Sequence, residues 1–120
     1  MHPSRKAQLE KGGIDVNDAL ERFMGNDALL ERFLKKFLSE KSYEGLVRAI
    51  EENDPETARV SAHSLKSVCG TIGCAAMRQL VLRQEQLIRN GQWDQAVALM
   101  PEISENYRSI CAVLKEQPAF

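Results

Sequence analysis

The sequence predicts an all-α protein, an antiparallel four-helix bundle with an additional short N-terminal helix. Three observations favour this class. Apolar residues recur at spacings of three and four along most of the chain, as on one face of a helix. No segment shows the period of two that is expected of a half-buried strand. The breaks carry Asp, Asn and Gly, the residues of helix ends, and short breaks of this kind join antiparallel neighbours in bundles.

The chain begins with a polar segment and a short helix. Residues 1–13 carry little apolar material and end in two glycines, so we expect a flexible tail or linker remnant there and the bundle domain over residues 14–120. Asp15 can cap a helix over residues 16–24, because its carboxylate can accept from the first free backbone amides. Gly25 ends this helix.

An apolar stripe at helical spacing comes next, and either Asn26 or Asp27 can cap it. Its members are Leu29, Leu30, Phe33, Leu34, Phe37 and Leu38. The stripe slips over residues 41–43 and resumes at Leu46. This stretch is therefore either one kinked helix or two consecutive helices.

A clear helix start follows at Asp54-Pro55-Glu56. Asp54 is a capping residue, Pro55 suits the first helical position, and the acid after it lies near the positive end of the helix dipole. The helix should run to about Ile72, where Gly73 permits a tight turn.

Two further helices complete the bundle. One covers roughly residues 75–90 and is followed by Gly91. The last begins near Trp93, and Pro101 must kink or restart it, because proline has no backbone N–H to donate. Beyond that proline an apolar seam repeats at spacings of four, three and four: Ile103, Tyr107, Ile110 and Leu114.

Composition and charge exclude several classes of protein. The 120 residues suffice for one domain, and 16 basic against 17 acidic residues give a net charge of −1, which argues against nucleic-acid binding. No apolar run has the length of a membrane span, and no secretory signal is present. Cys69, Cys74 and Cys111 lack CxxC spacing and are expected to be buried thiols. We expect a cytoplasmic monomer that binds neither nucleic acid nor membrane.

The helix after Asp54 places a histidine on its outer face. At about 100° per residue its apolar positions fall on one stripe and His63 lies about 160° from Leu65, so the imidazole should point to solvent. The outer ridge around His63 holds two cations and two small residues: Arg59, Lys66, Ser67 and Gly70. Such a histidine is most often an ordinary solvated residue. These neighbours, however, could stabilise an anionic phosphoryl group and leave room for another protein.

The next helix should bring a hydrogen-bond acceptor to this histidine. If the chain turns at Gly73-Cys74, residue numbers that sum to 147 or 148 lie level on the two antiparallel helices. Gln84 and Glu85 are then level with His63. Either side chain could accept from the imidazole Nδ1–H, which would leave Nε2 as the nucleophile.

With these residues the chain resembles the histidine-containing phosphotransfer (HPt) family. Its signature His-x-Leu-Lys-Gly corresponds to residues 63–67, with Gly73 at the place of a second glycine ten residues after His63. Residues 13–25 are similar to the family's N-terminal helix, and Glu85 stands where the family often has a Glu or Gln bonded to the histidine. The chain departs from the pattern at Ser67, where the family has glycine, so we expect altered partner fit.

The resemblance implies a phosphoryl carrier and not an enzyme. His63 would accept a phosphoryl group from a receiver aspartyl phosphate and pass it to another receiver, with Lys66 steadying the phosphoryl oxygens and Glu85 orienting the ring. Mg²⁺ is expected on the receiver, and no metal or other cofactor on this chain. Receivers and a hybrid histidine kinase are the expected partners. Leu20 and Phe23, beside Ala19, are expected in the docking surface with Arg59, Ser67 and Gly70, although Phe23 can equally pack over the end of the bundle.

A helical adaptor that binds receivers or other signalling proteins without phosphotransfer is the alternative, and Ser67 is the feature that favours it. Kinase activity is disfavoured because the chain has no room for an ATP-binding domain. A metal-binding bundle is disfavoured because there is no Glu-x-x-His pair and His2 lies in the expected tail. A free-standing protein and a domain of a larger kinase both fit the sequence.

Overall fold

The computed structural model, which describes residues 1–118 and 120, is helical and shows no strand in these residues. Eight helices follow in order: α1 (Pro3–Lys11), α2 (Val16–Arg22), α3 (Asp27–Phe37), α4 (Ser42–Glu51), α5 (Pro55–Ile72), α6 (Ala75–Arg89), α7 (Trp93–Ala98) and α8 (Met100–Lys115). Within the described part of the chain, no helix has both the length and the apolar character needed to cross a membrane.

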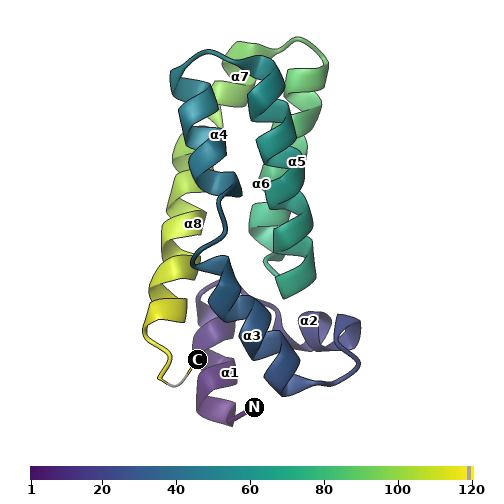
Figure 1. Cartoon of the computed structure of the whole chain (residues 1–120), viewed down its shortest axis with the longest axis vertical. Helices are drawn as coiled ribbons and strands as arrows, with labels where there is room; N and C mark the ends of the chain where they lie inside the picture. Colours follow the sequence, from purple (N-terminus) through teal and green to yellow (C-terminus); the bar gives the residue numbers. More distant parts are fainter. Residues whose placement is uncertain (119) are drawn as a thin grey trace.

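Four of these helices form the bundle that the sequence predicts. α4, α5, α6 and α8 run side by side along the long axis of the molecule, with α7 across one end (Figure 1). Each of the four is antiparallel to the next in the chain. α1, α2 and α3 gather at the opposite end, where α2 and α3 pack against α5 and α1 packs against α8. The all-α bundle class is confirmed, with more short helices than expected.

The interruption of the apolar stripe over residues 41–43 corresponds to the start of a second helix, so this stretch is two helices and not one kinked helix. α3 ends at Phe37 and α4 begins at Ser42. The Glu40 carboxylate accepts hydrogen bonds from the Ser42 backbone N–H at 2.9 Å and from the Ser42 hydroxyl at 2.7 Å. These bonds stabilise the start of α4 and separate it from α3.

The flexible tail expected over residues 1–13 is wrong, because most of this segment is helix α1. His2, expected in that tail, caps the helix: its Nδ1 accepts from the Ser4 backbone N–H at 3.0 Å. Leu9 is fully buried, and Arg5 forms an ion pair with Glu31 of α3 at 3.0 Å. One apolar anchor and several polar contacts hold α1 in place, so the segment has no hydrophobic periodicity that sequence reasoning could detect.

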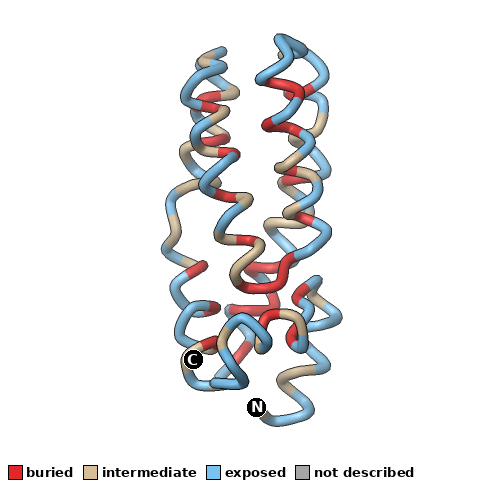
Figure 2. Tube along the Cα trace, turned by 90° about the vertical axis from the view of Figure 1, so that its right-hand side faces the viewer, coloured by how far each residue is buried: buried red, intermediate tan, exposed pale blue. Residues whose placement is uncertain are grey.

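The core lies on the facing sides of the bundle helices, and Figure 2 shows buried residues recurring along each of these helices. The predicted apolar stripe of α5 is confirmed, since each member is at most 1% exposed: Ala58, Ala62, Leu65, Cys69 and Ile72. Cys74 and Cys111 are also buried, and the three thiols are free, as expected. Tyr43 of α4 stacks on Tyr107 of α8 with ring centroids 3.7 Å apart.

The predicted helix ends are largely confirmed. Asp15 caps α2, Asn26 rather than Asp27 caps α3, and Asp54 caps α5, each accepting from a backbone N–H three residues later. α2 ends at Arg22, two residues earlier than expected. Pro101 restarts the last helix, so that α7 and α8 meet at Leu99.

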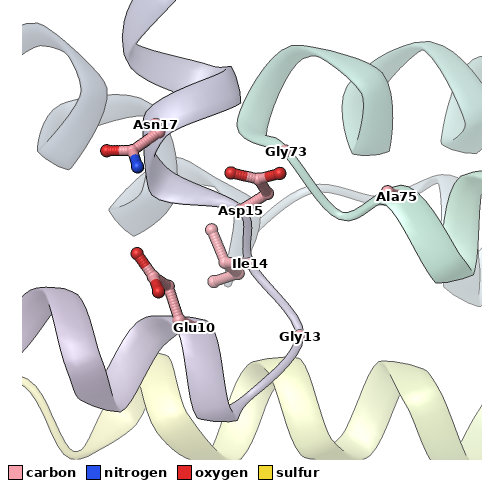
Figure 3. A pocket seen from close by; sticks show the side chains of 7 residues that line it. All are labelled: Glu10, Gly13, Ile14, Asp15, Asn17, Gly73 and Ala75. Atoms are coloured by element: carbon pink, nitrogen blue, oxygen red, sulfur yellow. The ribbon is translucent and has the colours of Figure 1, made fainter.

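The turn between α5 and α6 depends on Gly73. Its φ is +82°, in the left-handed region that favours glycine, and a Cβ there would lie 2.5 Å from the Asp15 carbonyl oxygen. The Asp15 backbone N–H donates to the Gly73 carbonyl at 2.8 Å, so the start of α2 is bonded to this turn. Figure 3 shows the pocket beside the turn, lined by Glu10, Gly13, Ile14, Asp15, Asn17, Gly73 and Ala75.

We predict that Gly73→Ala lowers the free energy of unfolding by about 2–4 kcal/mol, because left-handed strain adds to the clash with the Asp15 backbone. Urea denaturation would measure the loss. Gly91→Ala is the matched control: its φ is +74° but nothing lies within 4 Å of an added Cβ, so only the strain of about 1–2 kcal/mol remains. Equal losses for the two variants would contradict the role of the Asp15 contact.

Candidate functional site

His63 lies on the outer face of α5, as the helical wheel predicts. Its side chain is 54% exposed, and the ring nitrogen Nδ1 is 2.8 Å from Oε2 of Glu85 on α6. The contact that the hairpin register predicts is thus present. The ring is anchored at one nitrogen and presents its other edge away from Glu85.

Glu85 is the buried centre of the site. Its side chain is only 3% exposed and meets three donors from two helices. Lys66 Nζ lies 2.9 Å from Oε1, while Oε2 is shared by His63 Nδ1 and by Arg89 Nη2 at 3.1 Å. Both oxygens of this buried carboxylate therefore have hydrogen-bond partners, which a buried charge requires.

The ionisation of Glu85 decides the state of the histidine. Burial raises the pKa of this carboxyl, but the hydrogen bonds and charges of Lys66 and then His63 outweigh it, and the pKa of Glu85 lies below its ordinary value. An ionised carboxylate can only accept hydrogen bonds, so Nδ1 must carry the proton of the neutral ring. Nε2 of His63 then keeps its lone pair.

Gln84, the other candidate partner of His63, does not contact the imidazole, because its side chain points away from α5. It is fully buried, and its Nε2 donates to the Ala96 carbonyl at 3.0 Å and to Met100 Sδ at 3.1 Å. Consecutive helical residues point about 100° apart, so when Glu85 faces α5 its neighbour faces the junction of α7 and α8.

Lys66 follows His63 by three residues, about one turn, on α5. Its side chain is 18% exposed, and its ammonium group pairs with Glu85. One hydrogen bond uses one of three ammonium protons, so donors remain for a second anion. The structure thus brings together His63, Lys66 and Glu85 of the predicted site.

The predicted docking residues of α5 lie on the same ridge but have partners of their own. Arg59 forms an ion pair with Glu56 at 2.6 Å. Ser67 is exposed, and its hydroxyl donates to the His63 carbonyl at 3.2 Å. Gly70 is half-buried, and a Cβ there would lie 3.2 Å from Nε of Arg78. The space that we expected Gly70 to leave for a partner is therefore taken up by an α6 side chain.

The predicted docking residues in and directly after α2 lie at the Gly73 end of α5. Leu20 and Phe23 are half-buried and pack against the core, and the Phe23 ring centroid is 5.1 Å from that of Phe33. Ala19 is fully buried, so the expectation that it is exposed is wrong. The reading in which Phe23 packs over the end of the bundle is borne out.

Arg89 is the member of the site that sequence reasoning missed. Its guanidinium shares Oε2 of Glu85 with the imidazole. The signal was available, because an arginine four residues after a glutamate on a helix lies beside it. It passed unnoticed because such pairs are common on solvated helix faces.

Among residues 1–118 and 120, no group of three or more His, Cys, Asp or Glu side chains is placed to hold a metal ion. The positive charges beside Glu85 come from the Lys66 and Arg89 side chains.

The family comparison agrees with this geometry. The family model of the Hpt domain matches residues 28–113, which is more than half of the chain and includes His63, Lys66, Glu85 and Arg89. α1 and α2 lie before the matched segment. No curated protein and no solved structure matches the chain significantly.

We predict that the stability of the protein falls more steeply between about pH 5 and about pH 3 than that of Glu85→Gln. The folded pKa of Glu85 is lowered, so its stabilisation is present above the ordinary value of 4.5 and is lost as the pH falls through the folded pKa. The glutamine cannot titrate. Urea denaturation across this range would measure the difference, and parallel profiles would contradict it.

Proposed function

Because the chain belongs to the Hpt domain family, we propose that it is a phosphorelay module that accepts a phosphoryl group on His63 from one receiver and passes it to another. Membership implies histidine phosphotransfer in two-component signalling, and domains of this family are phosphocarriers that interact with receiver domains. The observation that carries the assignment of His63 is the 2.8 Å contact between its Nδ1 and the buried Glu85 carboxylate. This contact leaves Nε2 as the nucleophile.

The proposed step is an in-line displacement at phosphorus. The Nε2 lone pair of His63 attacks the receiver's aspartyl phosphate, the N–P bond forms, and the P–O bond to the aspartate breaks. The aspartate leaves as a carboxylate, and the Nδ1 proton stays in its hydrogen bond to Glu85. Transfer to a second receiver is the reverse reaction. Positioning and neutralisation of charge supply most of the catalysis in such transfers.

Charge around the ring favours the phosphorylated state. A phosphoryl group adds a charge of about −1.5 to −2 at neutral pH. Lys66 stands one turn from His63 with free ammonium protons, so it can turn toward the phosphoryl oxygens without leaving Glu85. The Mg²⁺ ion is proposed on the receiver, where it would neutralise the same oxygens.

The proposed docking surface joins the outer ridge of α5 to α2. Arg59 and Ser67 contribute from α5, and the exposed parts of Leu20 on α2 and of Phe23 directly after it complete the surface. Partners are proposed to be receivers and a hybrid histidine kinase, and the module is proposed to act as a cytoplasmic monomer.

Ser67 is the one feature that favours the adaptor as a second candidate. A side chain one turn from His63 could keep a receiver at a distance too great for transfer. Its hydroxyl, however, is turned back onto the His63 carbonyl, along the helix rather than toward a partner. This geometry supports the carrier over the adaptor.

We predict that phosphorylated receivers with Mg²⁺ label the protein with acid-labile, alkali-stable phosphate and leave His63→Gln unlabelled. The reason is that the His63 imidazole, hydrogen-bonded to Glu85, is the group proposed to form the N–P bond. His2→Gln is the matched control, since it removes the other histidine and should keep full labelling. If no receiver labels the protein while one binds it with measurable affinity, the protein is an adaptor and not a phosphoryl carrier.

We predict that Ser67→Gly raises the initial rate of phosphotransfer, by less than about tenfold. The gain is small because the hydroxyl is already turned away from the partner side. Single-turnover transfer from a phosphorylated receiver would measure it, with Ser67→Ala to separate the hydroxyl from the Cβ. A much larger gain would show that Ser67 is inhibitory.

A further inference from the structure

Two cations hold the Glu85 carboxylate from two different helices. Lys66 of α5 binds Oε1, and Arg89 of α6 binds Oε2. Because Oε2 also meets the imidazole, Arg89 Nη2 and His63 Nδ1 lie within two hydrogen-bond lengths of each other. Arg89 therefore touches the same atom that selects the protonated nitrogen of the ring.

The two cations are not equivalent. The Lys66 side chain is 18% exposed and that of Arg89 is 55% exposed, so Arg89 holds the carboxylate from the solvent side. Glu85 is buried, but Arg89 reaches it from the solvent side, where water screens the charge of the pair. Its main physical effect here is therefore on the direction of Oε2. Without it, Oε2 would keep only its contact with the imidazole itself, and Lys66 would hold the other oxygen.

Other arginines near the site do not duplicate this contact. Arg59 is occupied by Glu56, to which it donates from Nε at 3.2 Å and from Nη2 at 2.6 Å. Arg78 lies against Gly70, two turns from His63 along α5. Arg83, on the same helix as Arg89, is exposed and lines the groove between α6 and α8 with Glu102 and Asn106.

We propose that Arg89 is a positioning residue for phosphotransfer: it holds Oε2 of Glu85 against Nδ1 and so keeps His63 in the tautomer whose free nitrogen is Nε2. This inference rests on the proposed function. Arg89 acts through Glu85 and does not touch the reacting atoms. Its guanidinium can hold the carboxylate oxygen and keep further N–H groups in water, so ordering it costs little.

The test compares Arg89→Gln and Arg89→Lys with Arg83→Gln as the matched control, all in a His2→Gln background so that one imidazole remains. Long-range ¹H–¹⁵N NMR correlations at about pH 8 report the tautomer of the neutral ring. Phosphoramidate then loads the histidine without any receiver: the Nε2–P bond forms, the P–N bond of the reagent breaks, and ammonia leaves. ³¹P NMR follows the rate and the nitrogen modified.

We expect the parent and Arg83→Gln to show the Nδ1–H tautomer and equal loading at Nε2. Arg89→Gln should populate both tautomers and load Nε2 about threefold to tenfold more slowly. Arg89→Lys should recover most of the tautomer preference and rate, because it restores a cation at Oε2. Circular dichroism and urea denaturation confirm that each variant is folded, and the lysine variant alone suffices should the glutamine variant unfold.

Two results would overturn the inference. One is an Arg89→Gln variant with the tautomer and rate of the parent. The other is a slower variant whose tautomer is unchanged, which would place Arg89 on the phosphoryl group instead of behind the ring. Failure of the proposed function looks different: no receiver would label the parent, while the tautomer comparison among variants would still stand.

Discussion

The register of the α5–α6 hairpin is the constraint on which the rest of the site depends, and the turn at Gly73 sets it. The left-handed backbone of Gly73 reverses the chain in a few residues, so His63 and Glu85 lie level twenty-two positions apart in sequence. If α6 were shifted by one residue relative to α5, Gln84 would face α5 and the Glu85 carboxylate would point away from His63. The same turn accepts the backbone of Asp15, so the position of α2 and the geometry of the histidine share one origin.

From this register follows an electrostatic arrangement that places charge behind the nucleophile. Glu85 is buried, and a buried carboxylate without partners would take up a proton. Lys66 and the hydrogen bond to His63 keep the carboxylate ionised as an acceptor for Nδ1, and Arg89 adds a positive charge at Oε2. With a neutral imidazole, the four side chains together carry one positive charge. This net positive charge would favour the proposed phosphoryl group on His63.

Much of this architecture is local, and for that reason it was predictable. Asp15, Asp54 and Gly73 act within one turn of themselves, and Glu85 was reachable by counting along two helices from Gly73. The predictions that were wrong concern contacts between segments that lie far apart in the sequence. α1 is held by one buried leucine and by polar bonds to α3 and to the residues that follow α8, which leave no periodic pattern. Gly70 looked like open space because the sequence does not show that Arg78 crosses over it.

The division between buried and exposed groups fits a carrier that serves more than one partner. The groups that prepare the ring lie behind it on α5 and α6, inside the segment that matches the Hpt family. Leu20 on α2 and Phe23 directly after it lie outside that segment. The groups proposed for the transfer chemistry are thus separated from the proposed docking surface, which could differ between partners. The separation is not complete, because the Asp15 backbone at the start of α2 is bonded to the turn that aligns His63 with Glu85. A change in α2 that disturbs this bond would alter the geometry of His63 and Glu85 as well as the proposed docking surface.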